Sequence, residues 1–483
     1  MMGAVSTVAQ DLQETRVVVV GGGPGGYEAA LVARRRGADV TVVERQGLGG
    51  SAVLTDVVPS KTLIATAEWM TRFEHAAELG IRPAGDATTV DAGNAAALRV
   101  DLDVVNGRVL ALAAAQSADI RARLERDGVR IVVGSGRLDG PQRVVVDGGS
   151  SAAGETFDAD VVLVATGAAP RALPEAQPDG ERILTWTQLY GLIALPERLI
   201  VVGSGVTGAE FAGAYRGLGS DVVLVSSRDR VLPGEDPDAA QVIEDVFKAR
   251  GMTVLSRSRA QAAVRTDDGV EVTLADGRTV TGSHVLMAVG SVPNTAGLGL
   301  KEAGVRLRTG GYIEVDRVSR TSARGVYAAG DCTGVLPLAS VAAMQGRIAM
   351  AHALGDAVSP LDPKTVAATI FTTPEIATVG YNEDQLKAIG TAYLVSTLPL
   401  RGNPRAKMSG LRDGFVKLYA HSVTGVLLGG VVVAPRASEL IFPITLAFAH
   451  RLTADQVAQS FTVYPSLSGT VAEVARLLHR NQQ

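Results

Sequence analysis

Six glycines in two short stretches are the residues of this sequence best suited to bind phosphate. "GGGPGG" (21–26) follows the hydrophobic run "RVVVV", and "GSGVTG" (203–208) follows "RLIVV". In each stretch glycine occupies the first, third and sixth positions. This spacing is typical of a strand-to-helix turn that lets a pyrophosphate approach the backbone, and the helix N-terminus favours an anion. We therefore expect two dinucleotide-binding turns, built on Gly21, Gly23 and Gly26 and on Gly203, Gly205 and Gly208.

The residues that follow each turn indicate different nucleotides. Glu44 ends the run "ADVTVVE", and a carboxylate there can accept hydrogen bonds from a ribose diol. The matching position after the second turn is Ser226, with Arg228 and Arg230 just beyond it. Serine with two guanidinium groups suits a 2′-phosphate, so the second turn is predicted to bind NADP(H). The alternative is that both arginines belong to a solvated turn and that NAD(H) is also accepted.

The elements that must position these residues indicate an α/β fold. The hydrophobic runs before the glycines are β-branched and do not alternate, which is typical of buried parallel strands. Strand, glycine turn, helix and strand occur twice, about 180 residues apart. Residues 62–125 are expected to be largely helical. Beyond residue 360, "GFVKLYA" and "GVLLGGVVVA" indicate antiparallel strands, with helices expected near 438–449 and 470–480.

Composition excludes several classes of function. The 483 residues carry a formal net charge of −4 and no long basic run, which argues against nucleic acid as a partner. No secretory signal and no apolar run of about 18 residues is evident, so we expect a cytoplasmic protein without an integral membrane segment. Cys332 is the single cysteine, which excludes an intrachain disulfide, and the six histidines are scattered, so no metal site is expected.

Five further motifs complete a known pattern. They are "VPSK" (58–61), "VVLVATGAAP" (161–170), "VGSVPNT" (289–295), "TSARGVYAAGDC" (321–332) and "TTPEIATVG" (372–380). Together with the glycine turns, they resemble the pyridine nucleotide–disulfide oxidoreductase family, which includes lipoamide dehydrogenase and glutathione reductase. In this pattern 289–295 is a turn between domains and a strand ends on Asp331.

The resemblance implies two Rossmann-like dinucleotide-binding domains and a C-terminal α+β dimer-interface domain. The expected boundaries are 1–167 and 288–358 for the FAD-binding parts, 168–287 for the NAD(P)H domain and 359–483 for the dimerisation domain. It also implies which residues hold the cofactors. FAD would be held by Gly21, Gly23, Gly26, Glu44, Gly50, Lys61, Thr166, Gly167 and Asp331; the nicotinamide nucleotide would be held by Gly203, Gly205, Gly208, Ser226, Arg228, Arg230 and Gly290. Lys61 would lie beside flavin N5, paired with Glu210.

The sequence departs from this family at its catalytic sulfurs. Disulfide-reducing members read G-G-T-C-L-N-V-G-C-I-P-S-K, whereas here Ala52 and Val57 stand at the two cysteine positions. The partner's catalytic His-Pro pair is replaced by Tyr464 and Pro465, and Gly469 stands where a glutamate is expected. Sulfur exchange is therefore excluded. A flat acceptor that takes electrons directly from flavin fits instead, and a quinone is the best candidate.

The resemblance extends to actinobacterial lipoamide-dehydrogenase-like NAD(P)H:quinone reductases. It implies a homodimer in which Tyr464 acts on the partner's site, where Tyr464 and Lys61 would donate hydrogen bonds to the quinone. Lys61, Glu210 and Tyr464 are thus the candidate catalytic residues. Two alternatives remain: a soluble pyridine-nucleotide transhydrogenase, and a flavin-binding redox sensor without catalytic activity.

Overall fold

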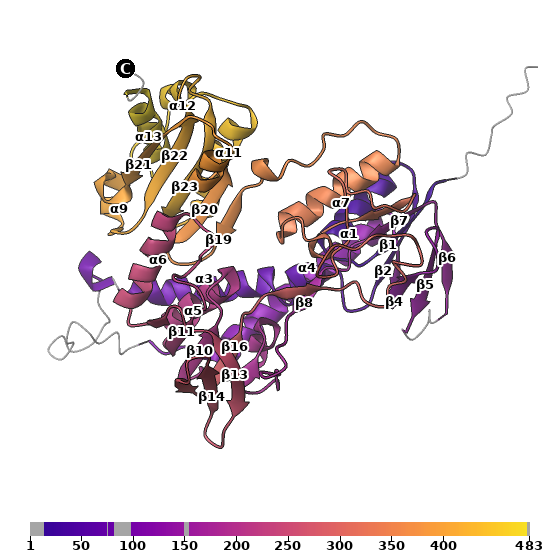
Figure 1. Ribbon diagram of the computed structural model, residues 1–483, viewed down its shortest axis with the longest axis horizontal. Coiled ribbons are helices and arrows are strands. Elements are labelled where there is room, and N and C mark those ends of the chain that lie inside the picture. The colour runs from indigo at the N-terminus through magenta and orange to yellow at the C-terminus, as the bar shows by residue number, and fades with distance from the viewer. Residues whose placement is uncertain (1–13, 75, 82–97, 149–153, 481–483) are drawn as a thin grey trace, which may run out of the picture. The chain divides into compact units, whose positions relative to one another are not determined.

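A computed structural model describes residues 14–74, 76–81, 98–148 and 154–480 (Figure 1). The chain forms two compact units, each assembled from three segments. The first unit contains residues 1–54, 114–169 and 292–361, and the second contains 55–113, 170–291 and 362–483. Both units combine strands with helices, which confirms the predicted α/β class.

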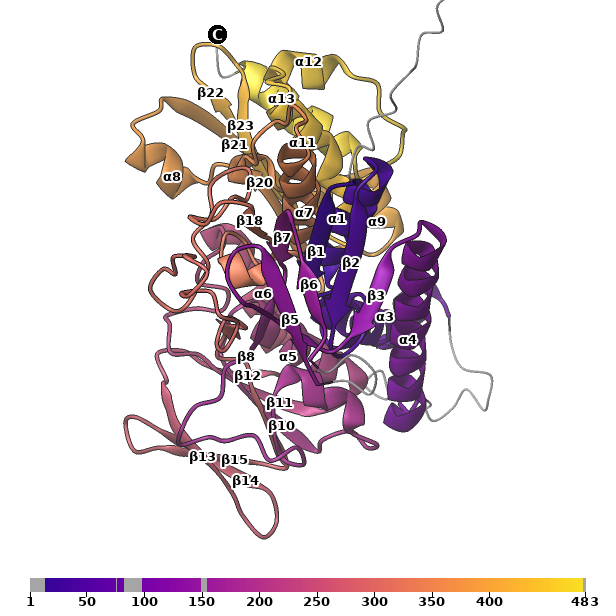
Figure 2. The ribbon, with the colours of Figure 1, turned by 90° about the vertical axis from the view of Figure 1, so that its right-hand side faces the viewer.

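The first unit is built on a five-stranded parallel sheet. Its strand order is β18-β7-β1-β2-β3, and Figure 2 shows β7, β1, β2 and β3 side by side. The strands are β1 (Arg16–Val20), β2 (Asp39–Glu44), β3 (Arg130–Val133), β7 (Val161–Val164) and β18 (Val326–Ala328). Helices α1 (Pro24–Arg35) and α7 (Ala339–Ala353) pack against each other. The valines of β1 are buried, as a parallel sheet covered on both faces requires.

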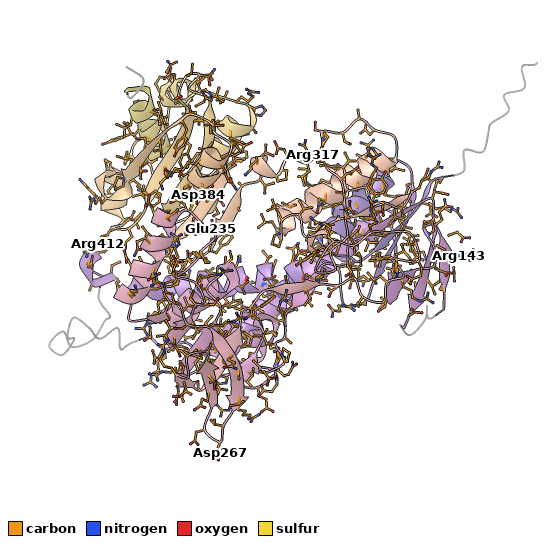
Figure 3. All side chains as sticks on the ribbon, in the orientation of Figure 1. Arg143, Glu235, Asp267, Arg317, Asp384 and Arg412 are labelled. Atoms are coloured by element: carbon orange, nitrogen blue, oxygen red, sulfur yellow. The ribbon has the colours of Figure 1, made fainter. Side chains whose placement is uncertain are left out.

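Shorter elements complete the first unit. They are the antiparallel strands β4 (Ser135–Leu138), β5 (Arg143–Asp147) and β6 (Thr156–Asp158), helix α2 (Gly50–Leu54) and the 3₁₀ turn η3 (Asp331–Thr333). Arg143 on β5, labelled in Figure 3, pairs with Asp158 on β6 at 3.0 Å. Both side chains are exposed, so this pair adds little stability.

Two expectations about short segments were wrong. The strand expected to end on Asp331 ends at Ala328, and Asp331 instead opens η3. The segment 289–295, expected as a turn, contains the strand β17 (Ser291–Pro293), which pairs with β8 (Ala168–Pro170). Both differences arise because a three-residue strand is too short to show a periodic pattern.

The second unit repeats the parallel plan. Its five-stranded sheet has the order β12-β11-β10-β16-β9. The strands are β9 (Ile183–Leu184), β10 (Arg198–Val202), β11 (Asp221–Val225), β12 (Thr253–Leu255) and β16 (His284–Met287), beside an antiparallel sheet of β13 (Ala260–Arg265), β14 (Val270–Leu274) and β15 (Thr279–Gly282). The helical elements are α3 (Val57–Glu74), η1 (Ala76–Leu79), η2 (Trp186–Gly191), α5 (Val206–Leu218) and α6 (Pro237–Ala249). Helix α4 (Leu102–Arg126) contributes residues to both units.

The predicted helical segment 62–125 is therefore two helices, α3 and α4. Residues 82–97 between them lie outside the described residues. Helix α3 packs closely on α5, since a Cβ at Gly217 would come within 3.2 Å of Thr71 Oγ1. This packing brings residues of the sequence near position 60 next to residues near position 210.

The C-terminal part of the second unit is an antiparallel sheet with helices. The strand order is β19-β20-β23-β22-β21, and the pairings are antiparallel, as expected for the strands beyond residue 360. The elements are η4 (Pro363–Thr365), β19 (Ala368–Ile370), β20 (Glu375–Gly380), α8 (Glu383–Ala388), β21 (Tyr393–Pro399), η5 (Leu400–Gly402), α9 (Pro404–Met408), β22 (Phe415–His421), β23 (Leu427–Ala434), α10 (Ala437–Leu440), α11 (Phe442–Ala449), α12 (Ala454–Gln459) and α13 (Gly469–Arg480). The helix expected over 438–449 is split at Ile441, because Pro443 starts a new helix rather than continuing the previous one.

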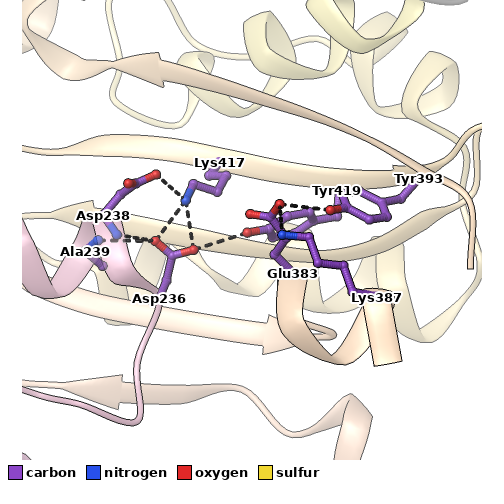
Figure 4. A network of polar contacts seen from close by, with 8 residues as sticks. All are labelled: Asp236, Asp238, Ala239, Glu383, Lys387, Tyr393, Lys417 and Tyr419. Atoms are coloured by element: carbon purple, nitrogen blue, oxygen red, sulfur yellow. Dashed lines mark hydrogen bonds and ion pairs between the residues drawn. The ribbon is translucent and has the colours of Figure 1, made fainter. Parts of the chain in front are cut away.

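A buried ion-pair network joins α6 to β22 within this unit (Figure 4). Lys417 Nζ on β22 donates to both carboxylate oxygens of Asp236 at 2.8 Å and to Asp238 at 2.6 Å. Tyr419 OH donates to Asp236 at 3.1 Å. Asp236 also caps α6, because its side chain accepts from the backbone N–H groups of Asp238 and Ala239. Burial opposes the charge of Lys417, but its hydrogen bonds to the two carboxylates outweigh burial and raise its pKa.

Candidate active site

The first glycine turn lies at the carboxyl end of β1. Gly21 has φ +106°, and a Cβ there would fall 2.3 Å from Ala165 O. A Cβ on Gly26 would fall 1.9 Å from Gly21 O, so the fold itself requires both glycines. Gly23 differs, because its φ is −68° and a Cβ would meet nothing closer than Gly50 Cα at 4.0 Å. The fold does not require a glycine at this third position, but a phosphate approaching the start of α1 does.

The other predicted FAD residues of the first unit gather at the same edge of the sheet. Glu44 ends β2, Thr166 and Gly167 follow β7, and Asp331 follows β18. These three strands and β1 are hydrogen-bonded neighbours, with Val20 level with Val164. Ligands of open parallel sheets bind at the carboxyl ends of such strands, so this arrangement fits a dinucleotide.

Glu44 already supports the turn before any ligand is considered. Its Oε2 accepts from the Gly22 N–H at 2.6 Å, and its Oε1 accepts from the N–H groups of Gln46 at 2.7 Å and Gly47 at 3.2 Å. A carboxylate offers about four acceptor sites, which leaves one for a ribose hydroxyl. Gly50 lies opposite the turn, since a Cβ there would come within 2.9 Å of Gly23 Cα.

Thr166 and Gly167 are held by Asn294, the residue that follows β17. Thr166 Oγ1 donates to Asn294 O at 2.7 Å, and the Asn294 side-chain amide donates to Thr166 O at 3.0 Å. Asn294 N–H also donates to Gly167 O, and Gly167 has φ +68°. Hydrogen bonds to Asn294 therefore hold Thr166 and Gly167 in place beside the carboxyl ends of β7 and β18.

The second glycine turn repeats the geometry of the first. Gly203 has φ +112°, and a Cβ there would fall 2.2 Å from Ala288 O, while one on Gly208 would fall 1.8 Å from Gly203 O. Gly205 caps α5 with φ −72°, and a Cβ there would meet nothing within 4 Å. Gly290, beyond the neighbouring strand β16, has φ +93°. The third position of this turn is again free for a phosphate.

The turn after β11 has Ser226 where β2 has Glu44, and Arg228 and Arg230 follow it. Ser226 is fully buried, and its hydroxyl is 2.7 Å from that of Ser204 in the glycine turn. Its side chain therefore supports the turn, as Glu44 supports the first. Arg228 is exposed, and among the described residues its guanidinium has no hydrogen-bond or ion-pair partner. Arg230 is half-buried, with Nε 4.0 Å from Asp229.

Lys61 and Glu210 form the predicted pair. Lys61 Nζ on α3 donates to Glu210 Oε2 on α5 at 2.6 Å. Glu210 is only 3% exposed, and its other carboxylate oxygen accepts from the Phe371 N–H at 2.8 Å. Lys61 Nζ also lies 4.9 Å from the centre of the Phe371 ring. The pair is thus a locally neutral unit that fixes an ammonium group, which can stabilise negative charge that develops nearby.

Neither the cysteine positions nor Cys332 offers a reactive sulfur. Cys332 is fully buried, and its thiol donates to Ala329 O at 3.3 Å. Burial raises its pKa to about 11, so it stays protonated at neutral pH. Tyr464 lies in a different setting, because it is 82% exposed beside the exposed Phe461 and Val463. Its phenol is therefore exposed in the single chain.

Sequence reasoning missed three residues at these sites. Phe371 fixes Glu210 through its backbone, and Arg257, exposed, donates its N–H to Arg228 O at 2.7 Å. Asp56, directly before α3, lies close enough to Lys61 and Glu210 for their charges to act on it. No pattern in the neighbouring sequence marks Phe371 or Arg257. Asp56 was marked, because it is an acidic residue in the stretch 49–61 that ends in Lys61.

The family models match almost the whole chain. Residues 15–346 match the pyridine nucleotide-disulphide oxidoreductase model, and residues 366–475 match the dimerisation domain of the same family. The chain belongs to this family. Membership implies a flavin and a pyridine nucleotide, which agrees with the two glycine turns, and confirms the predicted architecture of Rossmann-like domains with a dimerisation domain.

Individual proteins of this family are similar to the chain over almost its full length. The chain is 55% identical over 476 residues to an NAD(P)H dehydrogenase (quinone) of Mycobacterium tuberculosis, covering 96% of this chain and 94% of the relative. It is 32% identical to the dihydrolipoyl dehydrogenase of Geobacillus stearothermophilus, covering 96% of each. The crystal structure of LpdA from M. tuberculosis superposes with a TM-score of 0.89 at 54% identity, covering 96% of this chain and 99% of that one.

The described residues include neither a cluster of metal ligands nor a membrane-spanning helix. In the described ranges, no group of three or more His, Cys, Asp or Glu side chains could hold a metal ion. No helix in the part of the chain that the structure describes is long and apolar enough to cross a bilayer.

Proposed function

We propose that the protein is an FAD-dependent NAD(P)H:quinone oxidoreductase that works without a redox-active disulfide. One observation carries this proposal. Both glycine turns leave their third glycine open and Lys61 is paired with Glu210, whereas Ala52 and Val57 stand at the positions of the family's two sulfurs. The name of the M. tuberculosis relative, an NAD(P)H dehydrogenase (quinone), supports the same acceptor.

The FAD is proposed to lie along the first glycine turn. Gly23 and the N-terminus of α1 would hold its pyrophosphate, Glu44 a ribose, and Asp331 the ribityl chain. When bound, FAD accepts a hydride from the nicotinamide and passes two electrons to an acceptor. Lys61, fixed by Glu210, would place a positive charge beside the flavin, and the apolar Ala52 and Val57 would leave room for a flat ring.

The nicotinamide nucleotide is proposed to be NADPH, with NADH also accepted. Gly205 and the N-terminus of α5 would hold its pyrophosphate. Ser226 stands at the position where a carboxylate would repel a 2′-phosphate, and Arg228, whose guanidinium has no partner among the described residues, can bind that group instead. The dimerisation-domain match supports a homodimer, in which Tyr464 would reach the partner's quinone site.

The proposal is tested by measuring which electron acceptor the protein uses. The purified holoprotein should oxidise NADPH with menadione and show no turnover with oxidised lipoamide or glutathione disulfide. Turnover on either disulfide contradicts the proposal, since a single buried thiol cannot exchange disulfides. Comparable turnover with a thio-NAD analogue favours a transhydrogenase, and absence of turnover with every acceptor favours a flavin-binding sensor.

A further inference from the structure

A carboxyl group that has no hydrogen-bond partner in the described residues lies close enough to the Lys61–Glu210 pair for its charges to act on it. Asp56 directly precedes α3, and its backbone carbonyl accepts from the Ser60 N–H at 2.8 Å. Aspartate at such a position usually accepts a helix N–H with its side chain. Among the described residues, however, the Asp56 carboxyl group has no hydrogen-bond or ion-pair partner. Capping the helix therefore does not explain this side chain.

A second unpartnered group points to the same place. Tyr190 on η2 is 4% exposed, and within the described part of the chain its hydroxyl has no hydrogen-bond partner. Burial raises the pKa of Tyr190, and the negative charge of Asp56 raises it further, so the phenol stays protonated and can donate. Buried polar groups without partners are rare and are often found where a protein handles protons or ligands.

Asp56 differs from the charged groups around it because no opposite charge compensates its ionised form. The titratable or charged groups that act on it are Lys61 from α3, Glu210 from α5 and Tyr190 from η2, and Tyr215 from α5 acts on Tyr190 in turn. Lys61 and Glu210 cancel, and both tyrosines are neutral, so an ionised Asp56 leaves one uncompensated negative charge in a partly buried site. Burial raises the pKa of Asp56, with a further increase from Glu210 and an opposing effect of Lys61.

We propose that Asp56 is a proton reservoir for the reaction, acting through the Lys61–Glu210 pair. This inference rests on the proposed function. Reduction of a quinone by NADPH consumes one proton: NADPH, H⁺ and quinone give NADP⁺ and hydroquinone. NADPH supplies two electrons and one proton as hydride, and solvent supplies the second proton. An O–H bond forms on Asp56 when the two electrons enter the site, which keeps the local charge constant, and breaks when the acceptor takes electrons and proton.

Asp56 stands directly before Val57, which occupies the position of the family's second cysteine. Position 56 is glycine in the disulfide-reducing pattern, and position 57 is the second cysteine. A chain that has lost its thiols has also lost groups that can carry protons at this point. Asp56 adds one titratable group next to the ammonium of Lys61, without adding a permanent charge.

The direct test counts protons in the holoprotein and does not depend on quinone turnover. The midpoint potential of the bound flavin is measured against pH for the wild type and for Asp56→Asn. The wild type should bind one more proton per two electrons than the variant across the range in which Asp56 titrates. Difference infrared spectra should show a protonated carboxyl band on reduction in the wild type and none in Asp56→Asn.

The variant and its control are matched. Asparagine keeps the shape of aspartate and is an equally good helix cap. Because the folded state favours protonated Asp56, that carboxyl stabilises the fold at low pH and loses this contribution as pH rises, so the neutral amide should not lower the unfolding free energy at pH 7. Asp101→Asn is the control, since Asp101 caps α4 with an exposed carboxyl that accepts from the Val104 N–H at 3.2 Å.

Each outcome decides the proposal. Under it, Asp56→Asn reduces menadione about 10²-fold more slowly at pH 7 and loses the pH dependence of kcat, as expected for removal of a positioned proton donor. Asp56→Glu, which keeps the carboxyl group, should retain the infrared band. An unchanged proton count in Asp56→Asn overturns the proposal, and so does a wild type without the carboxyl band. If the wild type shows the band but no quinone turnover, the proposed function fails while the proton uptake by Asp56 stands.

Discussion

At the scale of single residues, the end of β11 governs the choice between NADPH and NADH. If Arg228 binds the 2′-phosphate, Arg228→Ala removes a charge-assisted hydrogen bond worth about 1.5–3 kcal/mol. We expect kcat/KM for NADPH to fall by about tenfold or more, with little change for NADH. Steady-state kinetics with both nucleotides measures this. Arg265→Ala, which removes an exposed arginine on β13, is the control, and equal losses for both nucleotides would assign Arg228 a structural role instead.

Single residues also show which parts of the candidate site could be predicted from the sequence. Lys61 and Glu210 are 149 positions apart, and only the resemblance to a family paired them. Asp56 was marked only as an acidic residue in the stretch that ends in Lys61. Its environment depends on Tyr190 of η2 and Glu210 of α5, which the fold, and not any spacing along the chain, brings close to it. Ser226 was found at the correct strand end, but its burial against Ser204 could not be read from residue type.

At the scale of elements, the Lys417 network fixes α6 after the arginine-bearing turn. Lys417→Met leaves Asp236 buried without its cation, and breaking a buried pair in this way costs about 3–5 kcal/mol. We expect the unfolding free energy to fall by that amount in denaturant titrations. Lys387→Met is the matched control, because Lys387 is 60% exposed in its pair with Glu383 and should contribute less than about 1 kcal/mol. Similar losses in both variants would show that the Lys417 pair has no special weight.

Elements were predictable where burial leaves a repeating pattern. The two βαβ units were evident because parallel strands covered on both faces are continuous hydrophobic runs, and the antiparallel sheet because its Gly and Pro residues separate short strands. The pairing of β8 with β17 was not evident, since each has only three residues. Domain boundaries at 167, 287 and 358 stay predictions.

At the scale of the whole molecule, the exposure of Tyr464 leads to a prediction about the dimer. Tyr464 is 82% exposed next to an exposed Phe461, so its proposed role at the quinone requires a second copy of the chain to cover it. In a twofold symmetric dimer each Tyr464 would then serve the site that contains the partner's Lys61. Lys61→Ala and Tyr464→Ala, each prepared alone, should both lose most quinone reductase activity, Lys61→Ala through the charge beside the flavin and Tyr464→Ala through the donor to the quinone.

Mixing the two variants separates action across the dimer from action within one chain. After dissociation and reassociation, half of the dimers are mixed, and each mixed dimer contains one intact site if Tyr464 acts on its partner. Activity should therefore return to about a quarter of the wild-type value, as random pairing in a twofold dimer predicts. If Tyr464 serves its own chain, no mixed dimer contains an intact site and activity stays at the level of the variants. A Tyr464→Ala protein with full activity removes the residue from the quinone site, leaving Lys61 as its single proposed donor.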